Sequence, residues 1–459
     1  MSRSTVLRAV TGAAVAGLAY LLVVQVVRGS DGWSAPVDLS TATQQADVSR
    51  AQVGVDARGN ATALWSDGNS VLRTAVRPAG GAWQKPVTLA LARNFQYGPQ
   101  LAVNAAGTAV AVWQRNDKRS DGFVVQAAVR PAGGAWQKPV DLSPGGSRRL
   151  AAGVGRRRFA AASRDPLPQV AIDRRGNAVV VWEHYRNGAA VVQAVTRPAG
   201  GAWRAPVDLA DTSSDRDLDH ALPDVAISPG GNAVAVWVSA VKLGYGPVQS
   251  ATRRAGGRWQ APTTISTSRR AFGARVTVDA RDVATAIWTS GASVQSARRK
   301  ADGRWRAPVA VFTGRHPSAP DVAVDARGDA VAIWGSSTAD KGIVQAAVRP
   351  AAGRWHRPVE ISDSARGDYA GGANLAVGAR GDAAVVWSVP DYDESQDDDQ
   401  SPEAIVLAAV RPAGEDWRAP VKLNEPSDFP SDPRVEVGAN GEVVAVWKGR
   451  MGIVQAAAR

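Results

Sequence analysis

Short runs in which apolar residues alternate with small or polar ones recur along most of this chain, roughly once every fifty residues. The stretch from Asp321 to Ser362 shows the unit well: DVAVDARGDAVAIW is followed by a polar loop and then by IVQAAVRPAAGRWHRPVEIS. Alternation with a period of two, bounded by residues that favour turns, is typical of β-strands. Each unit therefore predicts four short antiparallel strands joined by three connections.

The tryptophans divide into two series that repeat once per unit. One series ends a strand of alternating small and large residues such as AVAVW, and its members are Trp65, Trp113, Trp182, Trp237, Trp288, Trp334, Trp387 and Trp447. The other series opens a W-x-x-P strand, and its members are Trp33, Trp83, Trp136, Trp203, Trp259, Trp305, Trp355 and Trp417. Large aromatic residues repeated in every unit typically pack in the core. Eight of each series predicts eight units of the size of propeller blades.

The two ends of the repeat region complement each other. Residues from Trp33 to Ser40 form a fourth strand without the first three, whereas residues from Arg434 to Arg459 supply three strands without the fourth. A ring closed by pairing these ends needs this division, and closure removes exposed sheet edges. Residues 31–459 are therefore predicted to form an all-β, eight-bladed β-propeller of four-stranded antiparallel blades, closed by the N-terminal strand on the C-terminal blade.

The first thirty residues differ from the repeats. Arg3 and Arg8 precede an apolar run at residues 9–27. A helix of this length spans about 28 Å at about 1.5 Å per residue, which is close to the thickness of a hydrocarbon core. We expect residues 1–30 to be an export signal and membrane anchor with its amino end in the cytoplasm, because the positive charges precede the run. The propeller would then lie on the extracytoplasmic side of the cytoplasmic membrane, or be secreted if the leader is cleaved.

The charge and composition of the chain limit the partners and reactions that are compatible with it. The formal net charge of +12 would suit an anionic partner. Many arginines nevertheless recur at one place in the repeat, which favours a structural role for them: Arg77, Arg130, Arg197, Arg253, Arg349, Arg411 and Arg459. The absence of cysteine excludes disulfides, thiolate catalysis and cysteine-ligated zinc. The sequence contains no zinc-protease, nucleophile-elbow or phosphate-loop motif and no nucleic-acid module, so a nucleic-acid partner is not expected.

The turn before the second tryptophan carries a family resemblance. The segment Arg130-Pro131-Ala132-Gly133-Gly134-Ala135-Trp136 resembles the Asp-box, S-x-D-x-G-x-x-W, that joins the third and fourth strands of sialidase-type propeller blades. Gly133 and Trp136 are in register, whereas Val129 and Pro131 occupy the Ser and Asp positions. The boxes are therefore degenerate. The resemblance implies the fold of bacterial exported propeller repeat proteins, but sialidase catalytic residues cannot be assigned to positions of this chain.

Residues foreign to the repeat gather in the connections between strands two and three and between blades. Propeller geometry places both kinds of connection on one rim, and irregular loops on a rigid scaffold often carry binding. The aromatic and histidine candidates there are Tyr97, His184, Tyr185, Tyr245, His316 and Tyr369. Such side chains could stack on a sugar or a peptide. The alternative is that they only hold the loops in place.

Polar residues also begin the first strand of every unit. The equivalent positions are Gln52, Gln100, Gln169, Asp224, Arg275, Asp321, Asn374 and Arg434. In a ring they should surround the mouth of the channel, where they would bind a small ligand or be solvated by channel water.

Two charged loops stand apart from the repeat. Ser147 to Arg164 is rich in arginine, and we interpret it as a solvated insertion or as a contact for anionic lipid or an acidic polymer. The acidic loop carries oxygen ligands at alternate positions, Asp391, Asp393, Ser395 and Asp397. This alternation suits Ca²⁺, which takes six to eight oxygen ligands. The alternative is a disordered acidic loop, and no other cofactor is predicted.

Three functions are compatible with these features. The first is a monomeric, non-enzymatic recognition propeller that binds a cell-surface glycan or protein through its loop-rich rim. The second is a sialidase-like glycoside hydrolase or lyase. The third is a structural component of a cell-envelope complex, which an exposed apolar patch on an outer blade face would indicate.

Overall fold

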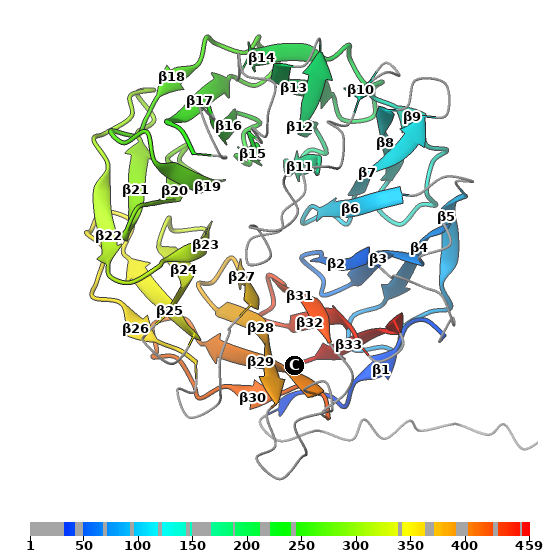
Figure 1. Ribbon diagram of the computed structural model, residues 1–459. Helices are drawn as coiled ribbons and strands as arrows, with labels where there is room; N and C mark the ends of the chain where they lie inside the picture. Colours follow the sequence, from blue (N-terminus) through cyan, green and yellow to red (C-terminus); the bar gives the residue numbers. More distant parts are fainter. Residues whose placement is uncertain are drawn as a thin grey trace, which may run out of the picture.

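Eight antiparallel sheets form a ring in the computed structural model, as the repeats predicted (Figure 1). The structure describes residues 32–41, 49–67, 71–91, 96–117, 122–143, 147–148, 167–186, 189–211, 221–239, 245–337, 342–362, 371–391, 403–425, 430–449 and 452–459. The predicted apolar helix at residues 9–27 lies outside these ranges. Within them, no helix has the length and apolar character needed to cross a membrane.

Each blade runs from an inner first strand to an outer fourth strand, and in all but the last blade these strands follow the order of the sequence. Blades one to three comprise β2 (Ser49–Val55), β3 (Ala61–Asp67), β4 (Val71–Arg77), β5 (Val87–Leu91), β6 (Gln96–Val103), β7 (Ala109–Asp117), β8 (Gly122–Arg130), β9 (Val140–Asp141), β11 (Gln169–Ile172), β12 (Ala178–Arg186), β13 (Ala189–Arg197) and β14 (Val207–Asp211). The short β10 (Ser147–Arg148) also pairs with β8, beyond the end of β9.

The remaining blades repeat this order. Blades four to six comprise β15 (Asp224–Ile227), β16 (Ala233–Val238), β17 (Val248–Arg253), β18 (Thr263–Thr264), β19 (Ala271–Val278), β20 (Ala284–Ser290), β21 (Ser293–Arg299), β22 (Val309–Thr313), β23 (Ser318–Val324), β24 (Ala330–Ser337), β25 (Gly342–Arg349) and β26 (Val359–Glu360). Blades seven and eight comprise β27 (Gly371–Val377), β28 (Ala383–Asp391), β29 (Glu403–Arg411), β30 (Val421–Lys422), β31 (Ser431–Val437), β32 (Val443–Lys448), β33 (Val454–Ala458) and β1 (Val37–Asp38).

The ring closes where the two ends of the repeat region meet, as predicted. In β1, Val37 lies opposite Ala456 and Asp38 lies opposite Gln455. The backbone N–H of Leu39 donates to the carbonyl of Val454 at 2.7 Å. β1 is thus the outer strand of the last blade, beside β33, and β33 has no free edge in this sheet.

Packing between blades explains the alternation of small and large residues. The first tryptophan series is fully buried, and each ring lies in a cluster that draws on neighbouring blades. Trp447, for example, packs with Val386 of blade seven and with Trp33 next to the closing strand. Several indole N–H groups donate to a glutamine on strand three, such as Trp334 to Gln345 Oε1 at 3.0 Å. The tryptophans therefore pack the blades together, as the sequence indicated.

The recurring arginines at the end of strand three also join neighbouring blades. Arg130 donates to Thr62 Oγ1 at 2.7 Å, and Arg349 donates to Thr285 Oγ1 at 2.9 Å; in both cases the acceptor lies on the preceding blade. Arg77 likewise joins blade one to blade eight, across the ring closure, but through an ion pair with Glu442. Burial lowers the pKa of the Arg349 guanidinium to about 10. This part of the positive charge is structural.

Candidate functional site

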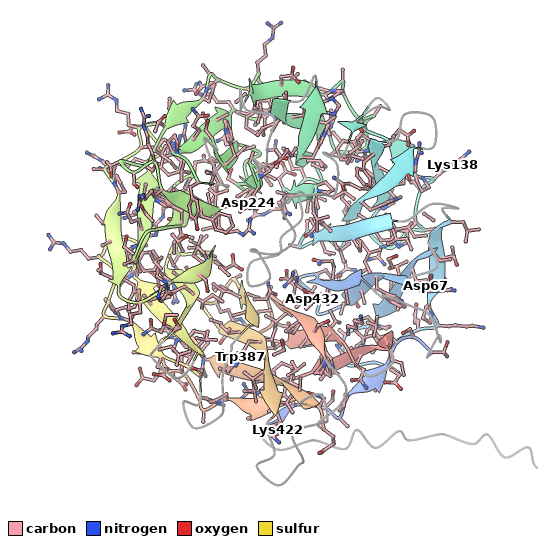
Figure 2. The ribbon with its side chains drawn as sticks, in the orientation of Figure 1. Asp67, Lys138, Asp224, Trp387, Lys422 and Asp432 are labelled. Atoms are coloured by element: carbon pink, nitrogen blue, oxygen red, sulfur yellow. The ribbon has the colours of Figure 1, made fainter. Side chains whose placement is uncertain are left out.

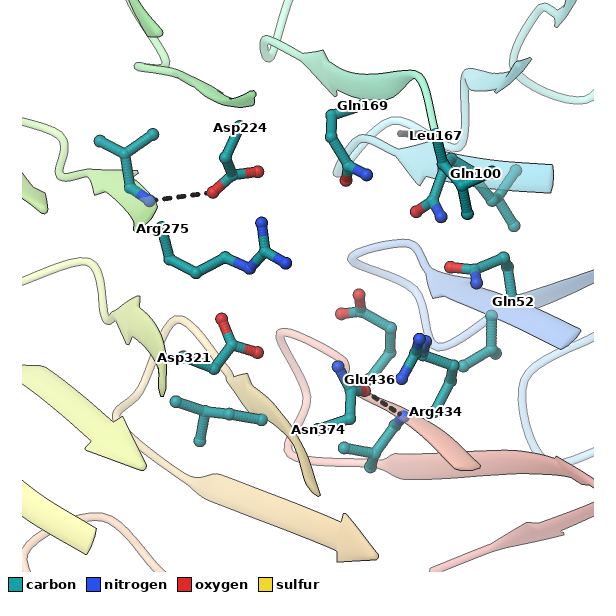
Figure 3. Close-up of a pocket in the computed structure, with 15 residues that line it drawn as sticks. Gln52, Gln100, Leu167, Gln169, Asp224, Arg275, Asp321, Asn374, Arg434 and Glu436 are labelled. Atoms are coloured by element: carbon teal, nitrogen blue, oxygen red, sulfur yellow. Dashed lines mark hydrogen bonds between the residues drawn. The ribbon is translucent and has the colours of Figure 1, made fainter. Parts of the chain in front are cut away.

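Eight polar side chains at the start of the first strands converge on one cavity of about 250 Å³ at the inner edge of the ring. We call these residues the channel ring: Gln52, Gln100, Gln169, Asp224, Arg275, Asp321, Asn374 and Arg434. Figure 3 shows their polar ends directed toward a common centre, with Arg275 reaching inward from its strand. Figure 2 places Asp224 at the inner edge of the ring and Lys138 and Lys422 at the outer edge. The structure thus brings together residues that are widely separated in sequence.

A β-bulge precedes many of these side chains. The pairing of strands one and two shifts register just before the channel-ring residue, for example between Tyr97 and Gln100 and between Ser431 and Arg434. The residue two places before the channel-ring residue has a positive φ in several blades: Gly98, Leu222, Gly273, Ala319, Gly372 and Asp432. Bulges redirect side chains, and non-glycine residues in this region are strained. We infer that the bulges aim the channel ring at the cavity.

Some members of the channel ring also connect adjacent inner strands. Asp224 Oδ2 accepts a hydrogen bond from the backbone N–H of Val276 at 2.9 Å. Asn374 Oδ1 accepts one from the backbone N–H of Val435, also at 2.9 Å. Both bonds run from one blade to the next, and both are drawn in Figure 3. These side chains therefore have a structural contact on one side and face the cavity on the other.

One functional candidate was missed by the sequence analysis. Glu436 lines the cavity with the channel ring, although it lies two residues further along its strand. The equivalent residues of the other seven blades are all small: Gly54, Ala102, Ala171, Ala226, Thr277, Ala323 and Ala376. A carboxylate at a position that otherwise takes small residues is the signal that could have identified it.

Glu436 also marks a change in the character of the channel. It lines a second cavity of about 330 Å³, which is bounded mainly by apolar side chains such as Val55, Val103 and Ile172. Its side chain is exposed to the channel, although the inner strands surround it inside the ring. Burial among these strands, together with the negative charge of Asp321, raises the pKa of the Glu436 carboxyl to about 7. The carboxyl is therefore poised to exchange a proton near neutral pH.

The raised pKa predicts a pH dependence of stability. In the unfolded chain this carboxyl ionises at about pH 4.3. Between that pH and about 7 the folded state binds more protons than the unfolded state, so the free energy of unfolding falls as pH rises through this window and then levels off. We expect Glu436→Gln to remove this component, so that the variant gains stability over the wild type between about pH 5 and pH 8. Thermal melts of both proteins across this range test it, and parallel curves would contradict it.

The aromatic candidates on the rim have different surroundings. Tyr245 is 46% exposed, and its ring centroid lies 5.9 Å from that of Phe272. An antiparallel bridge between Gly246 and Ala271 holds the connection after β16 against the start of β19. Phe272 is three residues before Arg275 in β19, so this aromatic pair stands on the same rim as the channel ring. His316 is exposed in the connection between blades five and six.

Three of these candidates lie in strands, and the prediction that they lie in loops was wrong. Tyr97 lies in β6, and His184 and Tyr185 lie in β12. The hairpin of blade three stays paired as far as Arg186 and Ala189, with Tyr185 opposite Ala190. His184 is half-buried there, opposite Val191.

The remaining candidates fall largely outside the described residues. This applies to Tyr369 and to Asp393, Ser395 and Asp397 of the acidic loop. Asp391 is the last residue of β28, where it lies opposite Glu403. Within the described ranges, no group of three or more His, Asp or Glu residues is arranged to hold a metal ion.

Comparison with known proteins shows that this chain shares its fold with other proteins. No protein-family model matches the chain, and no curated protein sequence matches it. The structure is similar to that of the BP39L lectin from Burkholderia pseudomallei, with a TM-score of 0.52 and 16% identity over 83% of this chain and 99% of the lectin chain. It also matches the NanB sialidase from Streptococcus pneumoniae (TM-score 0.41, 10% identity, 87% of this chain and 83% of that chain). A PL25 ulvan lyase matches with a TM-score of 0.45 and 11% identity over 83% and 96% of the two chains. The likeness to the lectin supports the propeller fold alone.

Proposed function

We propose that this protein is a non-enzymatic recognition propeller that binds a cell-surface glycan at the rim around the channel mouth. The observation that carries the proposal is the partly exposed aromatic pair Tyr245 and Phe272 beside the polar channel ring. Aromatic faces contact the apolar side of a sugar ring, while carboxylates and amides bind its hydroxyl groups. A lectin is among the proteins that share this fold, so the architecture is compatible with such a function.

A glycan array probed with the full chain tests this proposal. We expect binding to a defined set of glycans and a loss of about tenfold in affinity for Tyr245→Ala, because stacking area is removed without opening the core. Val87→Ala is the matched control, since Val87 is exposed at the start of the outer strand β5, at the opposite end of that strand from the connection to the next blade. An empty array, equal effects of the two substitutions, or capture of a protein in place of a glycan would count against the proposal.

The proposed location is the outer side of the cytoplasmic membrane. The apolar run at residues 9–27 and the preceding arginines support export and anchoring. Fractionation combined with protease treatment of intact cells provides the test. A membrane-bound chain whose propeller is cleaved from outside is expected, and a protected chain in the cytosolic fraction would contradict it.

A glycoside hydrolase or lyase is the second candidate. The observation in its favour is that Glu436, with its raised pKa, shares one cavity with Asp224 and Asp321. Carboxyl groups with different environments can divide the roles of acid and base in glycoside cleavage. Turnover of chromogenic glycosides or of uronate polysaccharides, abolished by Glu436→Gln, would establish this alternative over the non-enzymatic one.

A further inference from the structure

The cavity inside the channel ring carries charges of both signs in nearly equal number. Its lining contains three carboxylates, on Asp224, Asp321 and Glu436, and two guanidinium groups, on Arg275 and Arg434. The remaining polar members are carboxamides, on three glutamines and one asparagine. A small anion would meet the carboxylates and a small cation would meet the arginines, so neither sign of ligand is favoured overall. Because the cavity wall offers both hydrogen-bond donors and acceptors, it favours ligand groups that can both donate and accept.

Two donors inside the cavity have no hydrogen-bond partner. They are Gln52 Nε2 and Arg275 Nε. Both side chains are 7% exposed, so they are buried in the channel wall, and both residues line the cavity. In Figure 3 the two side chains extend toward the common centre from different sides of the ring. A buried donor is costly when left unsatisfied, and a ligand with oxygen acceptors on two sides could satisfy both.

The depth of the polar region is limited. Beyond Glu436 the channel is lined mainly by apolar residues of the inner strands, including Val55, Val103, Ile172 and Ile227. A heavily hydroxylated molecule would lose hydrogen bonds to water on entering that part. The polar cavity of about 250 Å³ lies below the range of about 300–1,000 Å³ typical of pockets for drug-sized ligands. The space therefore suits one sugar-sized unit and no longer chain.

We propose that the channel mouth is a binding site for a single uncharged polyhydroxylated unit, such as a free neutral monosaccharide or the terminal residue of a neutral glycan. Its hydroxyl oxygens accept from Gln52 Nε2 and Arg275 Nε, and its hydroxyl hydrogens donate to the carboxylates of Asp224, Asp321 and Glu436. The inference goes beyond the proposed function, because it depends on the channel ring and needs no contact with Tyr245 or Phe272.

Titration of the full chain with individual sugars tests the site. The panel contains neutral glucose, galactose, mannose and fucose, together with anionic glucuronate and cationic glucosamine, and binding is followed by calorimetry and ligand-observed NMR. Gln52→Met removes one unpartnered donor while keeping side-chain volume, and Arg275→Met removes the other. Gln137→Met is the control, since Gln137 is exposed in a connection far from the channel. Glycerol serves as a shorter neutral probe.

We expect at least one neutral sugar to bind, with affinity reduced about tenfold by Gln52→Met and unchanged by Gln137→Met. Arg275→Met should weaken binding at least as much, and Gln52→Met alone decides the question if the arginine variant does not fold. The proposal is overturned if no neutral sugar binds, if glucuronate or glucosamine binds more tightly, or if Gln52→Met and Gln137→Met bind alike. Binding of a neutral sugar together with an empty glycan array would refute only the proposal of glycan binding at the rim. Binding on the array without binding of any neutral monosaccharide would refute only the proposal of a site at the channel mouth.

Discussion

Deletion of residues 1–41 is expected to abolish the cooperative thermal transition of the propeller. The deletion removes β1 and leaves β33 as an open edge that has lost its bonds to Ser34 and Leu39. It also removes Trp33 and Leu39, which are buried in the clusters of blades seven, eight and one. An unpaired edge beside exposed apolar surface favours aggregation. Circular dichroism melts and light scattering should show a broad transition and association.

Two control chains make this prediction specific. Deletion of residues 1–31 alone keeps β1 and should leave the transition in place. A permuted chain that lacks residues 1–41 but carries residues 32–41 behind Arg459, through a short flexible linker, should recover it, because the strand can pair with β33 from either covalent connection. A chain lacking residues 1–41 that melts as cooperatively as the chain lacking residues 1–31 would show that closure contributes little.

The second large effect is expected at the buried tryptophans. Trp334→Ala should lower the free energy of unfolding by about 3–5 kcal/mol. The side chain is fully buried, its ring lies 5.4 Å from Phe312, and its indole N–H donates to Gln345. The cavity left behind would lie between two blades that cannot collapse onto it without moving the ring.

The other tryptophan series provides the comparison within the same blade. Trp355 is only partly buried and packs beneath the Arg349 guanidinium at 5.3 Å. Trp355→Ala should therefore cost clearly less than Trp334→Ala. Urea denaturation of both variants measures the difference, with the slope of the transition checked for two-state behaviour. Equal losses for the two substitutions would contradict the assignment of the first series to the core.

The fold could be predicted because its signals are local and repeated. Each blade carries one tryptophan of each series, and Trp33 to Ser40 supplies the strand that the last unit lacks. The channel ring could also be predicted, since equivalent positions in repeated strands must lie at equivalent places in a closed ring. The sequence did not show which residues each position faces, because Gln52 on β2 and Arg275 on β19 come to face one cavity only after the ring has closed.

Two features of the site depend on detail that the repeat pattern conceals. Glu436 stands at a position that takes small residues in the other blades, so its strand still alternates as the others do. Positive φ angles before the channel ring occur at Leu222 and Ala319, whose residue types do not predict them. The loop assignment of His184 failed for a related reason: strand length is set by pairing across the hairpin.

Ring closure underlies the channel and every site proposed within it, and an engineered disulfide tests it most directly. The chain contains no cysteine, so Asp38→Cys with Gln455→Cys introduces one defined pair at opposed positions of β1 and β33. Opposed residues of antiparallel strands lie about 4.5–5.5 Å apart at Cα, within reach of a disulfide. Asp141→Cys with Gln455→Cys is the control, since Asp141 is the equivalent residue of blade two and pairs with Gln126. Mass spectrometry and thiol titration after mild oxidation should show an intramolecular bond in the first protein and free thiols in the control; free thiols in both would contradict the closed ring.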